Sequence, residues 1–562
     1  MRVRTAGWPR PAVGVVLRNL APALVGTSLV VPSIVWVVLD RSVWPWDPAW
    51  YGEVSVDLWS TLRLNPEEWP ASMVHAFGAK PPAIAWLGQF FVPFGYLIRD
   101  QEVAMLLSII ASQATTVGLI YAACRRLGTG LLPAIAAGLV VAAAPLFVSM
   151  SHEYFAEPIQ TVSIAWCLFV LASAQRWPLA LTSAHLAGVL ALAMLAKLSS
   201  PAYLVAPVIA VVVLAFAARR TRDPHDEWAL SRHVLVSGAF SALLVAGAVA
   251  WYSVNIQSAV NHARNAGSDS GLYGVNRGFA NELVEWFGRF IDGSFLPHFG
   301  LTIFVLVVAA VAIAARTPRR IPILEARVVA GSSCLFAILL VLALFASQPN
   351  QEARYLLPLM PMLAVSIAVA LSAPRSKATT RVAVAVLTVE FALVTLQGFG
   401  HPLFSSLSYH RLVAPARDNR FHSHLESVVD TTCTPETANR ISIVGVDYPW
   451  LNHNTLELLA FERHARQGRK CYYTSLGYAE TSVPRAWKRV RDFNPPFFIS
   501  IDYGNPINTL PHPQRLMVVA PNPFNAVNRA VFRRLLRSQL FELVPGSRHD
   551  GFVILRARVI DK

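Results

Sequence analysis

The sequence predicts a mostly α-helical, polytopic membrane protein that ends in a small α/β domain. Runs of about 20 apolar residues recur along the first 400 positions, and each is long enough to cross about 30 Å of hydrocarbon. The chain is 54% hydrophobic and 14% charged, far more apolar than a soluble protein of this size requires. From about His401 onward Pro, His and polar residues become frequent, and no further 18-residue apolar run follows.

Eleven spans account for the apolar runs. They are expected at about residues 20–39, 103–123, 131–149, 158–174, 181–196, 202–218, 233–252, 297–315, 328–346, 355–372 and 382–399. Every connection that this arrangement places in the cytoplasm is basic, as the positive-inside rule requires: 125–126, 176, 219–222, 316–327 and 375–381. An arrangement with one span more or fewer stays open at residues 83–98 or 181–196.

The arginine-rich N-terminus precedes an apolar run too long for a cleaved signal peptide, so the first helix is expected to stay in place. The protein is therefore expected in the cytoplasmic (inner or plasma) membrane, with its N-terminus in the cytoplasm and its C-terminal domain outside. The formal net charge of +15 does not indicate nucleic-acid binding, because the basic residues cluster in short segments between spans.

The expected transmembrane module covers residues 1–400 and includes an external loop, 40–100. Within this loop, residues 49–62 alternate apolar and charged positions at helical spacing, which predicts a helix lying on the membrane surface. Residues 83–98 are expected to form a second interfacial or re-entrant piece.

The expected α/β domain covers residues 401–562. Strand-like segments at 441–448, 497–503, 516–520 and 551–559 alternate with helix-like segments at 456–466, 484–493 and 528–536. Cys433 and Cys471 both lie in this domain, and in an oxidising compartment they could pair. Two free thiols are the alternative.

Several polar residues are expected at the external ends of the spans, next to aromatic residues and prolines. They are Asp47 and Glu53 in the first loop, Lys80 in Ala-Lys-Pro-Pro, His152, Glu153 and Glu157 between the third and fourth spans, Lys197 after the fifth, and Arg354 before the tenth. Ordinary solvated loop charges are the alternative for each, and snorkelling to lipid headgroups is the alternative for Lys80 and Arg354.

The order of these residues along the chain resembles that of a known family. An aspartate follows the first span in Trp-Pro-Trp-Asp-Pro-Ala-Trp-Tyr, Lys-Pro-Pro opens the next apolar segment, and Arg-Tyr-Leu-Leu-Pro-Leu-Met-Pro opens a late span. Over about residues 15–400 the chain resembles the GT-C superfamily of membrane glycosyltransferases. The branch that it resembles is glycosyltransferase family 39, which includes protein O-mannosyltransferases and the aminoarabinose transferases that modify lipid A.

The resemblance implies inverting transfer of a sugar, hexosyl or pentosyl, from a polyprenyl-phosphate donor on the external face. It implies that Asp47 is the catalytic base and that Lys80 and Arg354 hold the donor phosphate, with Lys197 as a further candidate. Many members have a second carboxylate after the first-loop aspartate, where this chain has Pro48. Glu53, His152, Glu153 and Glu157 are therefore only candidates for holding the acceptor or a metal. The resemblance implies no particular cofactor, and a divalent metal stays open.

The implied partners are the lipid-linked donor, a lipid, glycan or protein acceptor, and membrane lipids, without nucleic acid. A transporter or flippase of a lipid-linked or envelope substrate is the main alternative. Transporters place ionisable groups near the middle of the bilayer, whereas the spans here hold few charges apart from Glu390. An envelope protein that binds a partner through its external domain and a glycan polymerase or ligase of another fold are the remaining alternatives.

Overall fold

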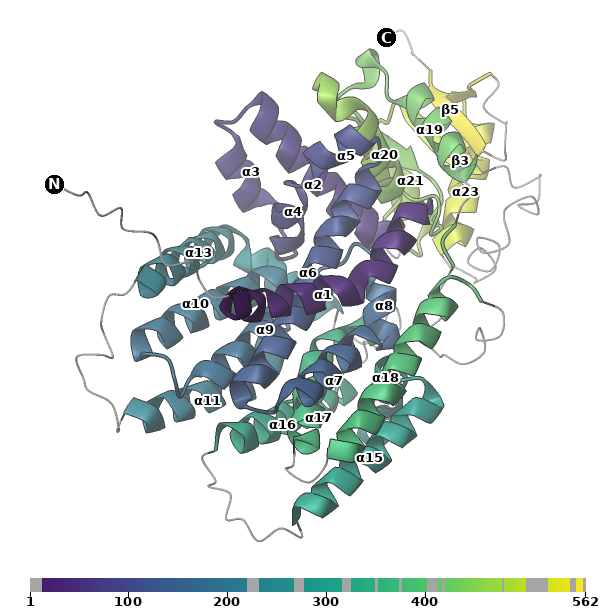
Figure 1. Cartoon of the computed structure of the whole chain (residues 1–562). Helices are drawn as coiled ribbons and strands as arrows, with labels where there is room; N and C mark the ends of the chain where they lie inside the picture. Colours follow the sequence, from purple (N-terminus) through teal and green to yellow (C-terminus); the bar gives the residue numbers. More distant parts are fainter. Residues whose placement is uncertain are drawn as a thin grey trace, which may run out of the picture.

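A computed structural model describes residues 13–219, 232–266, 277–315, 325–348, 352–372, 377–401, 412, 414–416, 420–477, 480–501, 524–545 and 552–558. The chain folds into a large helical bundle with a smaller α/β unit at one end, formed by residues 420–558 and called here the C-terminal unit (Figure 1). The division of the chain at residue 400 stays a prediction.

Helices occupy all eleven predicted spans. They are α1 (Val13–Leu39), α6 (Gln101–Leu127), α7 (Leu131–Ala142) with α8 (Pro145–Ser151), α9 (Glu157–Ser173), α10 (Leu179–Ala196), α11 (Ser200–Arg219), α13 (Arg232–Ala266), α15 (Pro297–Ala315), α16 (Ala326–Ala346), η1 (Ala353–Leu359) with α17 (Met360–Leu371), and α18 (Lys377–Gly398). By length and composition, 8 of the described helices can cross a membrane, or up to 10 when the bent pairs α7–α8 and α14 (Phe279–Ser294)–α15 each count as one span. The shorter apolar helix α9 occupies the remaining predicted span.

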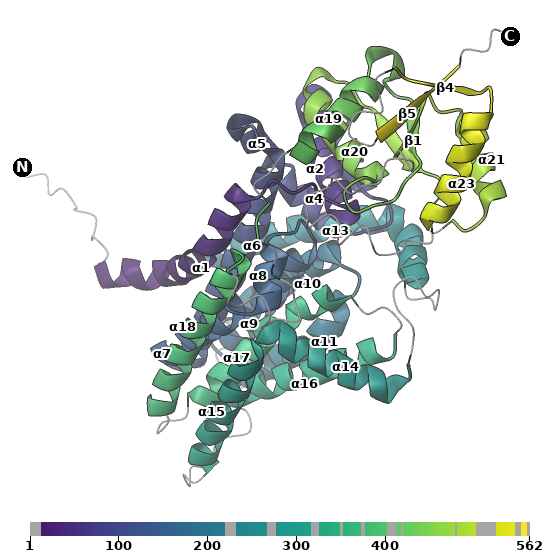
Figure 2. The same ribbon diagram turned by 90° about the vertical axis from the view of Figure 1, so that its right-hand side faces the viewer.

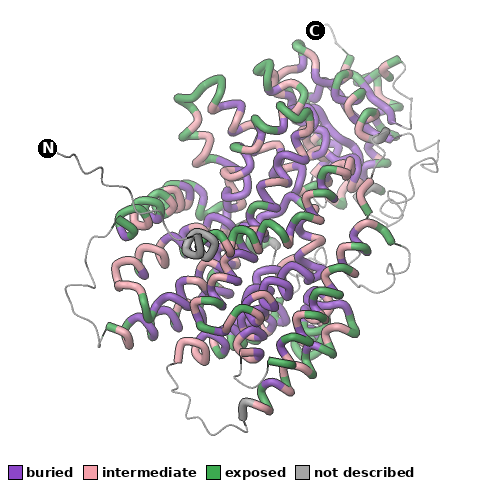
Figure 3. The backbone as a smooth tube through the Cα atoms, viewed as in Figure 1, coloured by how far each residue is buried: buried purple, intermediate pink, exposed green. Residues whose placement is uncertain are grey.

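The bundle is built around α6, whose apolar segment is 72% buried, whereas the corresponding segment of α13 is only 17% buried. Figure 3 shows the contrast between the buried central helices and the outer helices, which carry many exposed residues. Exposed side chains on those outer helices are large and apolar, such as Leu243 and Phe304. An apolar exterior of this extent requires lipid rather than water. The protein is an integral membrane protein.

Small residues let α1 cross closely over α6. A Cβ atom on Gly26 would lie 2.2 Å from the backbone oxygen of Ala114, and one on Gly118 would lie 2.8 Å from that of Pro22. Close approach of backbones at glycines is the usual way in which membrane helices associate. This crossing fixes the direction of α1 and therefore the point at which the first loop begins.

The first loop contains four helices: α2 (Trp46–Leu64), α3 (Trp69–His75), α4 (Ala83–Gly88) and α5 (Val92–Ile98). The helix predicted at 49–62 lies within α2, while the piece predicted at 83–98 consists of two short helices. Figure 2 shows the C-terminal unit above α2 and α4, at the end of the bundle where the first loop lies.

The C-terminal unit is a five-stranded sheet with helices on both faces. Its elements are α19 (Arg420–Thr432), β1 (Ile441–Val444), α20 (His453–His464), β2 (Tyr472–Ser475), α21 (Val483–Phe493), β3 (Phe497–Ile501), α23 (Phe524–Arg537), β4 (Phe541–Leu543) and β5 (Phe552–Ala557). The strand order is β2-β1-β3-β5-β4, with β1 parallel to β2 and β3, and β5 antiparallel to β3 and β4.

Successive side chains along each strand point to opposite faces of the sheet, so the C-terminal unit has one hydrophobic core on each face. Val444 and Ile499 pack with residues of α19 and α20 on one face, and Ile443 and Phe498 pack with α21 and α23 on the other. The strands predicted at 441–448, 497–503 and 551–559 are present, though shorter, and the strand predicted at 516–520 lies outside the described residues.

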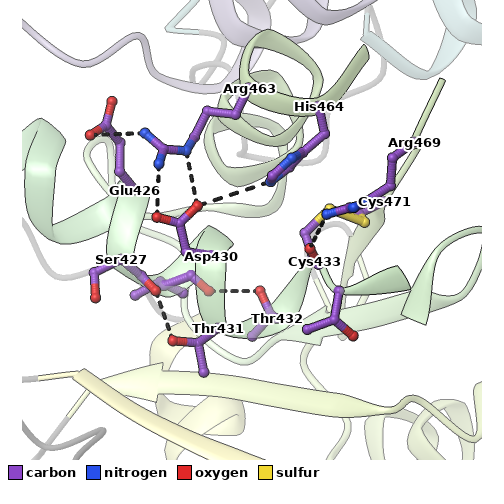
Figure 4. A network of polar contacts seen from close by, with 12 residues as sticks. Glu426, Ser427, Asp430, Thr431, Thr432, Cys433, Arg463, His464, Arg469 and Cys471 are labelled. Carbon is purple, nitrogen blue, oxygen red and sulfur yellow. Dashed lines mark hydrogen bonds and ion pairs between the residues drawn. A yellow bond between two sulfur atoms is a disulfide. The ribbon is translucent and has the colours of Figure 1, made fainter. Parts of the chain in front are cut away.

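A disulfide joins Cys433, just after α19, to Cys471, just before β2. Next to it, Figure 4 shows Arg463 of α20 between two carboxylates of α19. Its guanidinium donates to both oxygens of Asp430 at 2.8 and 3.0 Å and lies 3.2 Å from Glu426. The disulfide and the ion pairs together fix α19 against α20 and β2.

Charged groups also lie between the bundle and the C-terminal unit. Lys470 forms an ion pair with Asp57 of α2, and the His422 ring nitrogen of α19 lies 3.4 Å from a Glu102 oxygen of α6. Burial lowers the pKa of His422, but the Glu102 charge outweighs it and raises that pKa to about 9. Burial raises the pKa of Glu457, on α20, to about 8.

Candidate functional site

Three predicted residues from distant parts of the chain meet at Asp47. The Lys80 Nζ lies 2.7 Å from one Asp47 oxygen, and an Arg354 terminal nitrogen lies 3.7 Å from the other. The side chains of Asp47, Lys80 and Arg354 keep 30%, 16% and 18% of their surface accessible. Both cations are therefore held by protein and are still within reach of a ligand.

Glu157 forms a second ion-pair centre next to the first. Its carboxylate lies 2.5 Å from Lys197 Nζ and 3.2 Å from Arg354 Nε. The Glu157 side chain is only 2% exposed, whereas that of Lys197 is 24% exposed. Arg354 thus contacts both carboxylates, and the five side chains form one continuous charged cluster.

Aromatic rings pack against the three cations of this cluster. Lys80 lies over Trp50 and Tyr51, at 4.8 and 5.1 Å from the ring centroids. The Arg354 guanidinium lies 4.1 Å from the centroid of Phe155, and Lys197 Nζ lies 3.8 Å from that of Tyr355. Cations over ring faces are stabilised by the ring quadrupole, so these contacts help to hold the cations away from bulk water.

Local sequence explains how each charged side chain is presented. Asp47 lies in the first turn of α2, and Glu157 lies in the first turn of α9, which has Pro158 near its start. Lys197 follows the last residue of α10 in an extended conformation, and Arg354 lies in the short 3₁₀ helix that precedes α17. The charged groups therefore lie at element ends, where the chain leaves the apolar layer.

The electrostatics of the cluster keep Asp47 ionised. Burial would raise the pKa of Asp47, but the charges of Lys80 and Arg354 outweigh it and hold that pKa below its usual value. Burial lowers the pKa of Lys80, and Asp47 partly opposes this effect. Burial likewise lowers the pKa of Lys197, opposed by Glu157. Each charge in the cluster thus depends on its neighbours.

Glu153 and His152, two further candidates, lie in different surroundings. Glu153 is exposed and interacts electrostatically with Arg354 and Glu157. His152 instead stacks on Trp36, with ring centroids 3.7 Å apart, in a small apolar pocket between α1, α8 and α18.

Glu53 points toward the C-terminal unit, and the structure does not bring it to Asp47. Desolvation by burial, reinforced by the charges of Glu457 and Asp57, raises its pKa well above the usual value. The described residues contain no group of three or more His, Cys, Asp or Glu side chains that could hold a metal ion.

Two contributors to the cluster were not predicted. Glu352 lies 3.0 Å from Arg354 Nε, and Phe155 lies beneath the same guanidinium. The signal for Glu352 was its position two residues before Arg354, next to the motif. Phe155 lies inside the segment that supplied His152, Glu153 and Glu157, but an aromatic residue there is equally consistent with packing.

Comparison with protein-family models gives a match over part of the chain. Residues 291–451, less than a third of the chain, match the model of the Alg9-like mannosyltransferase family (Glyco_transf_22). No curated protein matches the chain by sequence.

Among solved structures, the chain is similar to ArnT from Cupriavidus metallidurans bound to undecaprenyl phosphate. The two are 15% identical over 97% of this chain and 98% of that one, with a TM-score of 0.52. The apo state of the same protein gives 14% identity over 96% and 97%, with a TM-score of 0.51.

The chain has the GT-C fold. The resemblance to the GT-C superfamily is thereby confirmed at the level of the fold, a helical bundle with a C-terminal sheet. The narrower resemblance to glycosyltransferase family 39 stays a prediction.

Proposed function

We propose that this protein is an inverting glycosyltransferase that moves a sugar from a polyprenyl-phosphate donor to an acceptor on the extracytoplasmic face of the membrane. The observation that carries the proposal is the Asp47 carboxylate flanked by Lys80 and Arg354 at the end of the bundle. The similarity to an ArnT structure that holds undecaprenyl phosphate supports a lipid-phosphate donor.

In the proposed reaction an acceptor hydroxyl or amine attacks the anomeric carbon of the sugar. The bond from this carbon to the acceptor forms as the bond to the phosphate oxygen breaks, and the acceptor proton passes to Asp47. The leaving group is already stable as a phosphate, so the enzyme must supply a positioned base and cations for the departing charge. Lys80 and Arg354 are the cations that would stabilise the departing phosphate. Lys197 contacts the same Glu157 carboxylate as Arg354.

Donor binding would also strengthen the base. In the structure, Lys80 and Arg354 lower the pKa of Asp47 against the effect of burial. A phosphate that shares these cations neutralises part of their charge, so the pKa of Asp47 rises toward the range in which a carboxylate accepts a proton effectively. The base is then most basic when the donor is in place.

The alternative of a transporter receives no comparable support. Glu390, a carboxylate in the apolar part of α18, accepts a hydrogen bond from the backbone N–H of Leu296 at 2.7 Å, just before α15 begins. A backbone donor at a helix start gives this carboxylate a structural role, whereas transport sites usually lie where ionisable groups gather near the middle of the bilayer.

Purified protein incubated with a panel of polyprenyl-phosphate sugars tests the proposal. We expect release of polyprenyl phosphate in equal amount to glycosylated acceptor, with inverted configuration at the anomeric carbon. Movement of an unmodified lipid-linked substrate across proteoliposomes, with no covalent transfer from any donor, would contradict it and favour the transporter.

The proposed side of the membrane can be tested separately. Gln539→Cys places a thiol at an exposed position of the C-terminal unit, while Cys124, Cys167 and Cys334 are buried. A membrane-impermeant thiol reagent should label the variant in intact cells but not the parent protein. Labelling only after lysis would place the C-terminal unit, and the site beneath it, in the cytoplasm.

A further inference from the structure

The segment that leads into α2 lies between the bundle and the C-terminal unit. The Trp44 ring stacks on Tyr154 of the bundle, with centroids 5.1 Å apart. The Trp44 backbone oxygen accepts a buried hydrogen bond of 2.8 Å from the Thr455 hydroxyl of α20. A Cβ atom on Gly52 would lie 3.0 Å from the Trp44 ring and 3.1 Å from Leu458, so α2 packs directly on α20 at this point.

The first residue of α2 is held by a second contact from the same unit. The Trp46 indole N–H donates a hydrogen bond of 2.7 Å to an Asp447 oxygen. Trp46 has a φ of +22°, a conformation that L-residues rarely adopt, and Pro45 before it gives α2 no side-chain cap. Local structure therefore does not fix the start of α2, and a tertiary contact at this residue must do so.

Asp47 follows Trp46 directly and depends on accurate placement. Its two oxygens face Lys80 and Arg354 at 2.7 and 3.7 Å, so a displacement of about 1 Å would break one ion pair or bring the other too close. Neither Trp46 nor Asp447 belongs to the charged cluster, and their hydrogen bond is exposed to solvent. Its position next to Asp47 is what distinguishes it from an ordinary contact between domains.

We infer that the C-terminal unit positions the Asp47 carboxylate through residues 44–46, with Asp447 and Thr455 as positioning residues. The inference rests on the proposed function, in which Asp47 is the base. It gives the C-terminal unit a part in the reaction without contact to either substrate. Displacing residues 44–46 should slow the transfer step and leave the cations that hold the donor phosphate largely as they are.

The test uses the full chain in detergent or nanodiscs with Trp46→Phe, Asp447→Ala, Thr455→Val and the Trp46→Phe/Asp447→Ala double variant. Asp492→Ala is the matched control, because Asp492 is an exposed carboxylate of the same unit that pairs only locally, with Lys488. Backbone hydrogen exchange over residues 43–50 reports placement without any substrate. Initial rates report kcat and the KM for the donor.

We expect faster exchange over residues 43–50 in the three single variants and a fall in kcat of about 10- to 100-fold, the effect of a misplacement near 1 Å. The donor KM should change by less than about 3-fold, because Lys80 keeps its contact with Trp50, and Arg354 keeps those with Phe155 and Glu157. The double variant should lose no more activity than the larger single loss, because both changes break one hydrogen bond. Asp447→Asn, which keeps an acceptor oxygen, should restore most of the kcat.

Wild-type exchange over residues 43–50 in all three single variants would overturn the inference, and so would losses of equal size in Asp492→Ala. An active wild type with unaffected variants would contradict the inference alone. A wild type that transfers nothing from any donor would contradict the proposed function, while the exchange data would still decide whether the C-terminal unit positions this segment.

Discussion

Replacing Lys80 with methionine should shift the pH dependence of transfer. Lys80 Nζ lies 2.7 Å from Asp47, and no other charge lowers the pKa of this carboxylate as much among the described residues. Two unit charges about 4 Å apart attract by about 4 kcal/mol at an effective dielectric constant near 20. One pKa unit corresponds to about 1.4 kcal/mol, so the pKa of Asp47 should rise by about 3 units on this scale, and by less if Arg354 moves closer.

Initial rates of transfer, measured from about pH 4 to about pH 9, report this shift. A base must be ionised, so kcat/KM falls as the pH drops through the pKa of Asp47. In Lys80→Met that acid limb should move up by about 1–3 units. The matched control is Lys470→Met, which removes the partner of Asp57 on the same helix and should leave the limb in place. An acid limb in Lys80→Met identical to the wild type would refute the reasoning.

Three further predictions concern stability. Glu157→Gln removes the carboxylate that pairs with Lys197 and with Arg354, and it should lower the free energy of unfolding by about 3–5 kcal/mol, measured by denaturation in detergent. Contact between the C-terminal unit and the bundle should weaken as the pH rises. The contribution of neutral Glu457 to this contact is complete below pH 4.5, the pKa of an unfolded glutamate, and is lost as the pH rises through about 8. The contribution of charged His422 is complete below pH 6.5 and is lost as the pH rises through about 9. Hydrogen exchange at the interface would detect both losses. Replacing Cys433 and Cys471 with serine should destabilise the C-terminal unit by about 4 kcal/mol on the chain-entropy model, measured by urea unfolding.

Each of these has a contrasting control. Asp492→Asn removes an exposed helix pair with Lys488 and should cost less than about 1 kcal/mol, and an equal cost in Glu157→Gln would contradict the first prediction. Glu457→Gln should reduce the pH dependence of the interface, and an undiminished dependence would contradict the second. Identical unfolding of the wild type with and without reductant would contradict the third.

The bundle was predictable because its signals are local. Each span is a run of about 20 apolar residues, and the flanking arginines set its expected direction. The C-terminal sheet was predicted only in part. β2 (Tyr472–Ser475) and β4 (Phe541–Leu543) have 4 and 3 residues and lie at the two edges of the sheet, so the segments are too short for alternation to identify them.

The charged cluster was predictable as a set of residue types but not as a set of contacts. The motifs placed Asp47, Lys80 and Arg354 at the same end of the bundle. They did not indicate that Glu157 would pair with Lys197 and Arg354, because that contact depends on the packing of three helices. The resemblance also left Glu53 as a candidate for the second carboxylate, yet its position along α2 turns it toward the C-terminal unit.

The central claim is that the Asp47 carboxylate acts as the base in sugar transfer. The most direct measurement compares wild type with Asp47→Asn under saturating donor and acceptor, with donor binding measured on the same preparations. We predict that Asp47→Asn binds the polyprenyl-phosphate donor and loses at least about 100-fold in kcat, the contribution expected of a positioned base. Transfer at the wild-type rate by Asp47→Asn would contradict the account.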